Sequence, residues 1–246
     1  MDLSDILPVP NLLEARNVLC FQPHPDDLDI AAGGTLFRLT DAGARVTLVT
    51  MTDGSKGTSD PNQEPRTLAE SRRAEQTAAT QATGVQNLVW LPYVDGELPE
   101  TDAVRDQIIS LIRRIRPDLV LTIDPDIPYE AHPDHLRTGR MVLAAALFAP
   151  LPRFAFGSEP HEVPAVALAQ THRPNTYVDV TAVFDRKLSA VAAHRSQFPP
   201  EQLQRFSAYL HVRCADYGKK IGAQYAEAFK VLTPTHLHYN PDAEEC

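Results

Sequence analysis

The sequence has little of what would mark a membrane, disulfide-bonded or polyanion-binding protein. Three cysteines occur in 246 residues, an odd set without the spacing of a disulfide framework or a cysteine zinc site. No apolar run approaches the roughly 20 residues of a membrane span, and residues 1–16 lack the apolar core of a signal peptide. A formal net charge of −9 disfavours a general binder of nucleic acid or anionic lipid. We therefore expect a cytoplasmic protein that binds neither nucleic acid nor membrane.

What the sequence does contain, along residues 1–150, is an alternation of strand and helix patterns. Apolar or β-branched runs predict strands, and segments with 3.6-residue periodicity predict helices between them. The expected strands are 18–21, 45–52, 87–91 and 119–123, and the expected helices are 29–41, 68–83, a segment from the N-cap Thr101 to Pro117, and 138–148. Because such alternation is typical of parallel βαβ units, we predict an α/β fold with a three-layer, mostly parallel Rossmann-like sheet and helices on both faces.

Residues 151–246 follow a less regular pattern. Short apolar pieces at 166–168 and 177–180 lie among prolines and predict edge strands, while 181–194 and 201–217 have helical patterns. We expect one domain over residues 1–246, with the parallel core in 1–150 and a C-terminal cap of helices and edge strands in 151–246.

Two polar motifs follow predicted strands: QPHPDD at 22–27 and HPDH at 132–135. The carboxyl ends of parallel strands meet at one edge of a sheet, where ligands bind in open α/β folds, so His24, Asp27 and His135 can converge. Proline stiffens both motifs. Two imidazoles and one carboxylate are a typical protein set for a catalytic Zn²⁺ with an open position. Fe²⁺ or Co²⁺ could use the same ligands.

The remaining residues of the motifs suggest catalytic roles. Zn²⁺ lowers the pKa of a coordinated water to about 7, and Asp26, directed away from its neighbour Asp27, can act as the general base. His132 could donate to the oxyanion of a tetrahedral intermediate or protonate the amine. Asp134 could orient either imidazole. Each motif alone is a weak signal, since such pairs are usually exposed loop residues, but their placement at two strand ends favours a metal site.

The two motifs together resemble those of the LmbE-like, or PIG-L, family of zinc-dependent N-acetylglucosaminyl deacetylases. Weaker matches in family order are the segments GGTL at 33–36, TDG at 52–54, DGEL at 95–98, RPD at 116–118 and HRSQ at 194–197. The resemblance implies a hydrolase that removes an N-acetyl group from an N-acetylglucosamine conjugate and forms homo-oligomers, hexamers among them.

The resemblance also implies roles for individual residues. His24, Asp27 and His135 would bind zinc, Asp26 would be the general base and His132 would stabilise the oxyanion. By the same resemblance, Arg72 and Asp95 would be the substrate-binding residues that hold sugar hydroxyls.

Some of these positions have simpler interpretations or depart from the family. Arg72 could instead pair with Glu75 on a helix surface, Asp95 could only shape the turn with Gly96, and His194 could interact with a helix dipole. Leu28 stands where many members have glutamate, with Asp29 one place later. Tyr129 and Glu130 precede the second motif, where some relatives place an aromatic residue or arginine that touches substrate.

Three functions therefore compete. The first is hydrolysis of an N-acetyl amide on an amino sugar. The second keeps the metal and hydrolyses another amide or an ester, including a phosphoester. The third is a non-catalytic module that binds sugar or supports assembly.

Overall fold

The computed structural model describes residues 6–239 and residue 243, so that Cys246 lies outside the described part. The strands are β1 (Asn17–Gln22), β2 (Arg45–Thr52), β3 (Asn87–Tyr93), β4 (Leu119–Ile123), β5 (Val166–Ala169), β6 (Thr176–Asp179) and β7 (Ala226–Leu232). The helices are η1 (Leu12–Glu14), α2 (Asp27–Asp41), α3 (Pro65–Thr83), α4 (Asp102–Ile115), α5 (Pro133–Phe148), η2 (Thr181–Val183), α6 (Phe184–Val191), α7 (Pro200–Gly218) and α8 (Pro234–His238).

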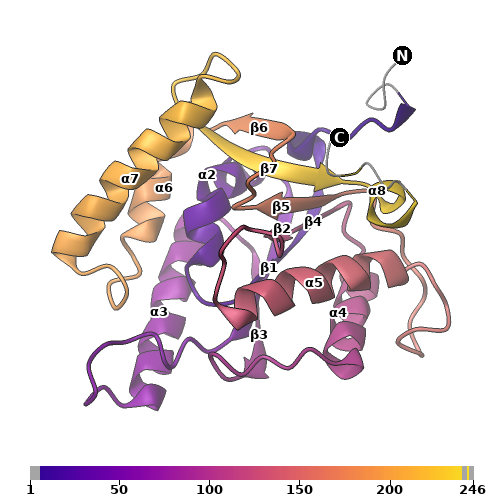
Figure 1. Cartoon of the computed structure of the whole chain (residues 1–246), viewed down its shortest axis with the longest axis horizontal. Helices are drawn as coiled ribbons and strands as arrows, with labels where there is room; N and C mark the ends of the chain where they lie inside the picture. Colours follow the sequence, from indigo (N-terminus) through magenta and orange to yellow (C-terminus); the bar gives the residue numbers. More distant parts are fainter. Residues whose placement is uncertain (1–5, 240–242, 244–246) are drawn as a thin grey trace.

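The strands form one seven-stranded sheet in the order β3-β2-β1-β4-β5-β7-β6. Neighbours from β3 to β5 are parallel, whereas β7 is antiparallel to both β5 and β6. Helices α4 and α5 cover one face, and α2, α3, α6 and α7 cover the other (Figure 1). This arrangement confirms the predicted α/β fold with a mostly parallel sheet between two helical layers.

The central strand β1 shows why this layering forms. Val18 and Cys20 pack into the apolar cluster shared with α2, while Leu19 and Phe21 pack into the cluster shared with α4 and α5. Alternate side chains of a strand point to opposite faces, and both faces of a parallel sheet are covered by helices. All four residues are fully buried, so packing on both faces fixes the position of β1 and of the loop that follows its carboxyl end.

Helix α2 approaches the antiparallel part of the sheet closely, and Gly34 permits this approach. A Cβ atom at Gly34 would lie 2.7 Å from Cβ of Val180, whereas one at Gly33 would lie 3.4 Å from Cγ of Lys187. Of the two adjacent glycines, Gly34 is therefore the one that the close packing requires.

Several elements differ from the sequence prediction. The helix expected over 181–194 is the short η2 followed by α6, which ends at Val191, and α8 was not predicted. Helix α5 begins at Pro133, not at Thr138, because proline fits the first helical position and His132 caps it. Strand β7 was not predicted at all, since Glu227 and Lys230 interrupt its apolar pattern. Through β5, β6 and β7 the C-terminal third joins the sheet, and its description as a separate cap on one domain stays a prediction.

Cys20 and Cys214 are buried, unbonded thiols. Across residues 6–239 and 243, the structure contains no helix with both the length and the apolar character needed to cross a bilayer.

Candidate metal centre

The turn between β1 and α2 is anchored on both sides. The Pro23 carbonyl accepts hydrogen bonds from the Thr52 backbone N–H at 2.9 Å and from the Thr52 hydroxyl at 2.8 Å. The backbone N–H of His24 donates to Oδ2 of Asp27 at 2.8 Å. These contacts, together with the two prolines, fix His24 and Asp27 relative to the sheet edge.

The second motif lies at the start of α5, beyond the loop that follows β4. His132 is the N-cap, and its Nδ1 accepts a hydrogen bond from the Asp134 backbone N–H at 3.3 Å. Pro133 occupies the first turn, so His135 lies one turn into the helix on the side that faces α2. The loop geometry therefore brings both motifs to the same edge of the sheet, as the sequence predicted.

Three side chains converge at this edge in a geometry that could hold one metal ion. Nδ1 of His24 lies 3.4 Å from Oδ2 of Asp27, and Nε2 of His135 lies 3.4 Å from Oδ1 of the same carboxylate. One donor atom from each residue lies within 4.8 Å of the others. Two imidazole nitrogens and a carboxylate fit Zn²⁺, and they also fit Fe²⁺ or Co²⁺.

Carboxylates face the other nitrogen of each imidazole. Nε2 of His24 lies 3.1 Å from Oδ1 of Asp95 and 3.3 Å from Oδ2 of Asp134. Nδ1 of His135 lies 3.3 Å from Oε2 of Glu130. A carboxylate that accepts a hydrogen bond here orients a metal-binding imidazole and makes it more basic. Asp134 is in hydrogen-bond contact with His24, whereas Glu130 lies near His135 without a hydrogen bond to its buried Nδ1. The predicted contact of Asp134 with an imidazole is thus present, and it involves His24.

A second set, formed by His24, Asp95, His132 and Asp134, also brings potential ligand atoms within 4.8 Å of one another. Its carboxylates are less available, because the Asp134 oxygens accept the backbone N–H groups of Gly96 at 2.7 Å and Leu98 at 3.2 Å. With Nε2 of His24 held by this set, Nδ1 is left for the group with Asp27 and His135. The donor chemistry therefore favours that group as the metal centre.

Asp26 has an unusual backbone and an unusual environment. Its φ is 103°, in the left-handed region that few residues other than glycine adopt. The Gln76 side chain accepts the Asp26 backbone N–H at 2.8 Å, and Nη2 of Arg72 donates to Oδ2 of Asp26 at 3.2 Å. Burial, and then the neighbouring charge of Asp27, raise the pKa of Asp26 to about 7. A carboxyl group with such a pKa is suited to accept and release a proton near neutral pH.

Arg72 is buried and directed to Asp26, not to Glu75. It also donates to the carbonyl oxygens of Pro25 at 2.7 Å and Gly54 at 3.1 Å. Glu75 instead accepts the backbone N–H and the hydroxyl of Ser196. The alternative of a surface pair between Arg72 and Glu75 is therefore wrong.

The sugar contacts expected of Arg72 and Asp95 stay predictions. The structure shows the Arg72 guanidinium against the carboxylate of Asp26, and the Asp95 carboxylate against His24.

His132 lies at the edge of the site with a partly exposed side chain. Burial, followed by the charges of His24 and His135, lowers its pKa, which favours the neutral imidazole. Since Nδ1 accepts a backbone hydrogen bond, a neutral His132 carries its proton on Nε2. That N–H is available to a ligand in the site, and the role of His132 as a donor stays a prediction.

Sequence reasoning assigned no role to Glu130, Gln76 or Asp29, which support the site. Glu130 faces His135, and Gln76 links Asp26 to Asp29, whose Oδ2 also accepts from His194 Nε2 at 2.9 Å. His194 is fully buried, so the proposed interaction with a helix dipole gives way to this contact with Asp29. Only the HRSQ match at 194–197 gave a sequence signal for it.

Comparison with known proteins places this geometry in a family. Residues 19–146 match the family model described as PIG-L, GlcNAc-PI de-N-acetylase. The chain belongs to the PIG-L family. It is 40% identical over 235 residues to diacetylchitobiose deacetylase of Thermococcus kodakarensis, covering 94% of this chain and 88% of that protein. It is 34% identical over 194 residues to a probable N-acetyl-alpha-D-glucosaminyl L-malate deacetylase 2 of Bacillus cereus, covering 74% and 84% of the two chains.

The fold of this PIG-L protein also agrees with solved structures. The structure of N,N′-diacetylchitobiose deacetylase from Pyrococcus horikoshii superposes with a TM-score of 0.94 at 38% identity, covering 99% of this chain and 95% of that one. A hydratase from Pseudomonas putida shares the fold alone, with a TM-score of 0.77 at 21% identity, covering 88% and 96%.

Proposed function

We propose that this PIG-L protein is a metal-dependent N-deacetylase that hydrolyses the acetamide of an N-acetylglucosamine conjugate to acetate and a free amine. The observation that carries the proposal is the buried carboxylate of Asp26 beside the convergent donors His24, Asp27 and His135. Relatives named as deacetylases of N-acetylated amino sugars support the same reaction.

In this proposal the ligand set would hold one divalent metal ion, with Zn²⁺ as the first candidate and Fe²⁺ or Co²⁺ as alternatives. Such an ion supplies Lewis acidity and lowers the pKa of a water molecule. Asp134 and Glu130 would keep the two imidazoles in place through their outer nitrogens.

The protein's own side chains would move the proton and stabilise charge. Asp26 would accept a proton from the attacking water and pass it to the departing amine, and Arg72 would fix the orientation of its carboxylate. The Nε2–H of His132 would donate to the oxygen on which negative charge develops, which is the usual role of a fixed donor at an acyl centre. Asp95 would hold the His24 imidazole and, as the resemblance implies, contact a sugar hydroxyl together with Arg72.

The test is acetate and amine release from N-acetylglucosamine conjugates by metal-free protein to which Zn²⁺, Fe²⁺ or Co²⁺ is added back. We expect activity only with metal, at a stoichiometry of one ion per chain. Release of phosphate from phosphoesters with two ions per chain would favour the phosphoesterase alternative. Tight sugar binding with no turnover under any metal would favour the non-catalytic module.

Location and assembly form part of the same proposal. The unbonded buried thiols Cys20 and Cys214 suit a reducing compartment such as the cytoplasm. The family resemblance implies a homo-oligomer, with a hexamer as one form, and light scattering of the purified protein tests this.

A further inference from the structure

The backbone of Asp26 needs support from its surroundings. Its φ of 103° lies in a region that residues other than glycine rarely adopt, and such a conformation persists only where neighbouring groups hold it. The Asp26 backbone N–H donates to Oε1 of Gln76 on α3 at 2.8 Å, so a side chain 50 positions later in the sequence supports this turn.

Gln76 is fully buried, and its amide is satisfied on both sides. Oε1 accepts a second hydrogen bond, from Nε2 of Gln22, at 2.8 Å. Nε2 of Gln76 donates to Oδ2 of Asp29 at 2.8 Å and to Oγ1 of Thr80 at 3.4 Å. A glutamine amide has two acceptor lone pairs and two N–H groups, so this one makes every hydrogen bond that it can make. Its position is therefore fixed against both β1 and α2.

The direction of the Gln76 amide is set by Asp29. An ionised carboxylate only accepts hydrogen bonds, so the NH2 group of Gln76 faces Asp29 and its oxygen faces the Asp26 N–H. A reversed amide would bring two N–H groups together at Asp26. Nε2 of the buried His194 donates to the same Oδ2 of Asp29 at 2.9 Å. A chain of hydrogen bonds thus runs from His194 through Asp29 and Gln76 to Asp26.

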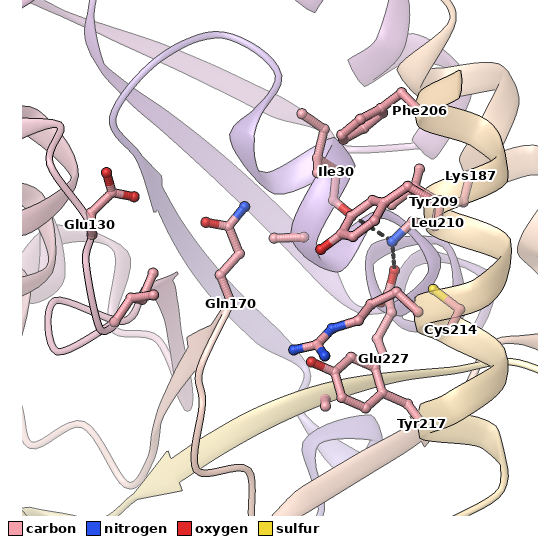
Figure 2. A pocket seen from close by; sticks show the side chains of 14 residues that line it. Ile30, Glu130, Gln170, Lys187, Phe206, Tyr209, Leu210, Cys214, Tyr217 and Glu227 are labelled. Atoms are coloured by element: carbon pink, nitrogen blue, oxygen red, sulfur yellow. Dashed lines mark hydrogen bonds and ion pairs between the residues drawn. The ribbon is translucent and has the colours of Figure 1, made fainter. Parts of the chain in front are cut away.

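His194 reaches Asp29 because α6 is held against α2. Nζ of Lys187, on α6, donates to the Ile30 carbonyl of α2 at 2.7 Å and to Oε1 of Glu227 at 2.5 Å (Figure 2). Ile30 directly follows Asp29, and His194 lies three residues after the end of α6. The Lys187 contacts therefore hold the segment that carries His194 close to the first turn of α2.

Gln22, at the end of β1, supports the same turn on its other side. Its Oε1 accepts the Leu28 backbone N–H at 3.1 Å, and its Nε2 donates to Oγ1 of Thr50 at 2.9 Å as well as to Gln76. The two glutamines thus hold the backbone N–H groups at positions 26 and 28, on either side of Asp27. Asp26 is in this way fixed relative to the metal-binding set.

We propose that Gln76 is a positioning residue, which holds Asp26 in the orientation that proton transfer requires, and that Asp29 and His194 set the direction of its amide. This inference rests on the proposed function for the role of Asp26 as the general base. Position matters at this step, since a displacement of about 1 Å in an active site can lower a rate about 10²-fold.

The experiment compares Gln76→Leu, Asp26→Asn and the double variant in the full-length, zinc-loaded protein. Leucine is similar in size to glutamine and removes both the acceptor and the donors. The matched control is Gln81→Leu, the same substitution at an exposed position of α3. Each protein is assayed for amine release from N,N′-diacetylchitobiose, and its zinc content is measured by elemental analysis.

We expect Gln76→Leu to lower kcat by about 10–100-fold. KM should stay within about threefold and zinc content should not change, because the residue acts through Asp26. In the Asp26→Asn background the same substitution should change kcat by less than about twofold, since no base is left to be misplaced. Gln81→Leu should match the wild type. Losses that multiply in the double variant, or a kcat of Gln76→Leu equal to that of the wild type, would overturn the inference.

Hydrogen exchange of the Asp26 amide, measured by NMR with and without Zn²⁺, tests the contact without an activity assay. Exchange should be slow in the wild type and in Gln81→Leu, and at least about tenfold faster in Gln76→Leu. If Gln76→Leu does not fold, Gln76→Asn replaces it, because the shorter side chain keeps an amide that cannot span from the Asp26 N–H to Asp29. Unchanged exchange in the folded variant would contradict the proposed support.

The two readouts separate this inference from the proposed function. If the wild-type protein and Gln76→Leu release amine equally well, the inference fails and the proposed function stands. If the wild-type protein releases no amine, the proposed function fails, and exchange of the Asp26 amide alone decides whether Gln76 holds this backbone.

Discussion

The neighbours of Asp26 determine both its left-handed backbone conformation and the raised pKa of its carboxyl group. The Gln76 side chain accepts its backbone N–H, and Arg72 donates to its carboxylate. The Asp27 carboxylate instead lies against His24 and His135. The two adjacent carboxylates therefore face different partners. This division supports separate roles for them, with Asp27 toward the metal ligands and Asp26 toward the substrate.

The first prediction concerns catalysis by Asp26. Asp26→Asn preserves size and a hydrogen-bond acceptor for Arg72 but removes the base, so kcat should fall by about 10²–10⁴-fold, the usual contribution of a general base. Metal content, measured by elemental analysis, should not change. Asp126→Asn, at an exposed position after β4, serves as the control and should retain full activity. Full activity of Asp26→Asn with metal bound would contradict the assignment.

The second prediction concerns pH and stability in the metal-free protein. The pKa of Asp26 rises to about 7 in the fold from an ordinary value of 3.8. Between these values the folded state binds the extra proton, so this residue makes the protein less stable as pH rises from about 4 to 7. Asp26→Asn should consequently stabilise the metal-free protein more at pH 7.5 than at pH 4.5.

Urea denaturation of both proteins at the two pH values measures this difference. An equal change in the free energy of unfolding at both values would show that the carboxyl group is not perturbed.

At the scale of single elements, the sequence predicted regular segments well where one signal dominates. Strands β2 and β4 match the expected bounds because β-branched residues fill them, and Thr101 caps α4 as expected. The start of α5 was placed late, since the helix begins within the metal-binding motif itself. Strand β7 was not predicted, because charged residues at two of its buried positions interrupt the apolar pattern. The burial of these charges depends on tertiary partners that the local sequence does not indicate.

The close approach of α2 to the sheet gives the third prediction. Gly34→Ala would place a methyl group 2.7 Å from Cβ of Val180, so we expect a loss of about 1–3 kcal/mol in the free energy of unfolding. Gly33→Ala is the matched control, since its Cβ would meet only Cγ and Cβ of Lys187, at 3.4 and 4.0 Å, which are ordinary van der Waals distances. There the higher helix propensity of alanine should leave stability unchanged or raise it by up to about 1 kcal/mol. Equal effects of the two substitutions would argue against the contact with Val180.

The buried contact between His194 and Asp29 gives the fourth prediction. Burial alone lowers the pKa of His194, but the hydrogen bond and charge of Asp29 outweigh it and raise the pKa. A histidine with a raised pKa in the fold stabilises the protein fully below its unfolded pKa and loses that contribution as pH rises through the folded value. His194→Gln should therefore destabilise the protein more at pH 5.5 than at pH 8.5, by about 1.5–3 kcal/mol at the lower pH.

Thermal and urea unfolding of His194→Gln at both pH values measure this effect. A destabilisation that grows with pH would mean that His194 is neutral in the fold.

At the scale of the whole molecule, the sequence could predict those site residues that directly follow strands of the parallel sheet. The convergence of His24, Asp27 and His135 was predictable, because two motifs followed strands that a parallel sheet places side by side. The supporting residues Glu130 and Gln76 were not, since their roles arise from packing between a loop, a helix and the metal ligands. Long-range contacts of this kind leave no local pattern in a sequence.

The last prediction follows from the placement of the donors on both motifs. Since the donors come from the turn before α2, the first residue of α2 and the first turn of α5, a bound ion would connect two parts of the fold that are far apart in sequence. Metal at 100 times its Kd should stabilise the native state by about 2.7 kcal/mol, seen as a rise in Tm after metal is added to chelator-treated protein. Asp27→Asn should remove most of this rise. A Tm insensitive to metal in the wild-type protein would contradict the site.

The position of β7 in the sheet has a consequence for how the protein is made. β7 is the last strand along the described chain, yet it pairs between β5 and β6, and it carries Glu227, the partner of Lys187. During synthesis, β5 and β6 are therefore complete before the strand that pairs with both of them. Lys187 is likewise synthesised before Glu227, the carboxylate that pairs with its ammonium group. The antiparallel part of the sheet cannot form until residues 226–232 have left the ribosome, so the parallel strands of the emerging chain can pair before the antiparallel ones.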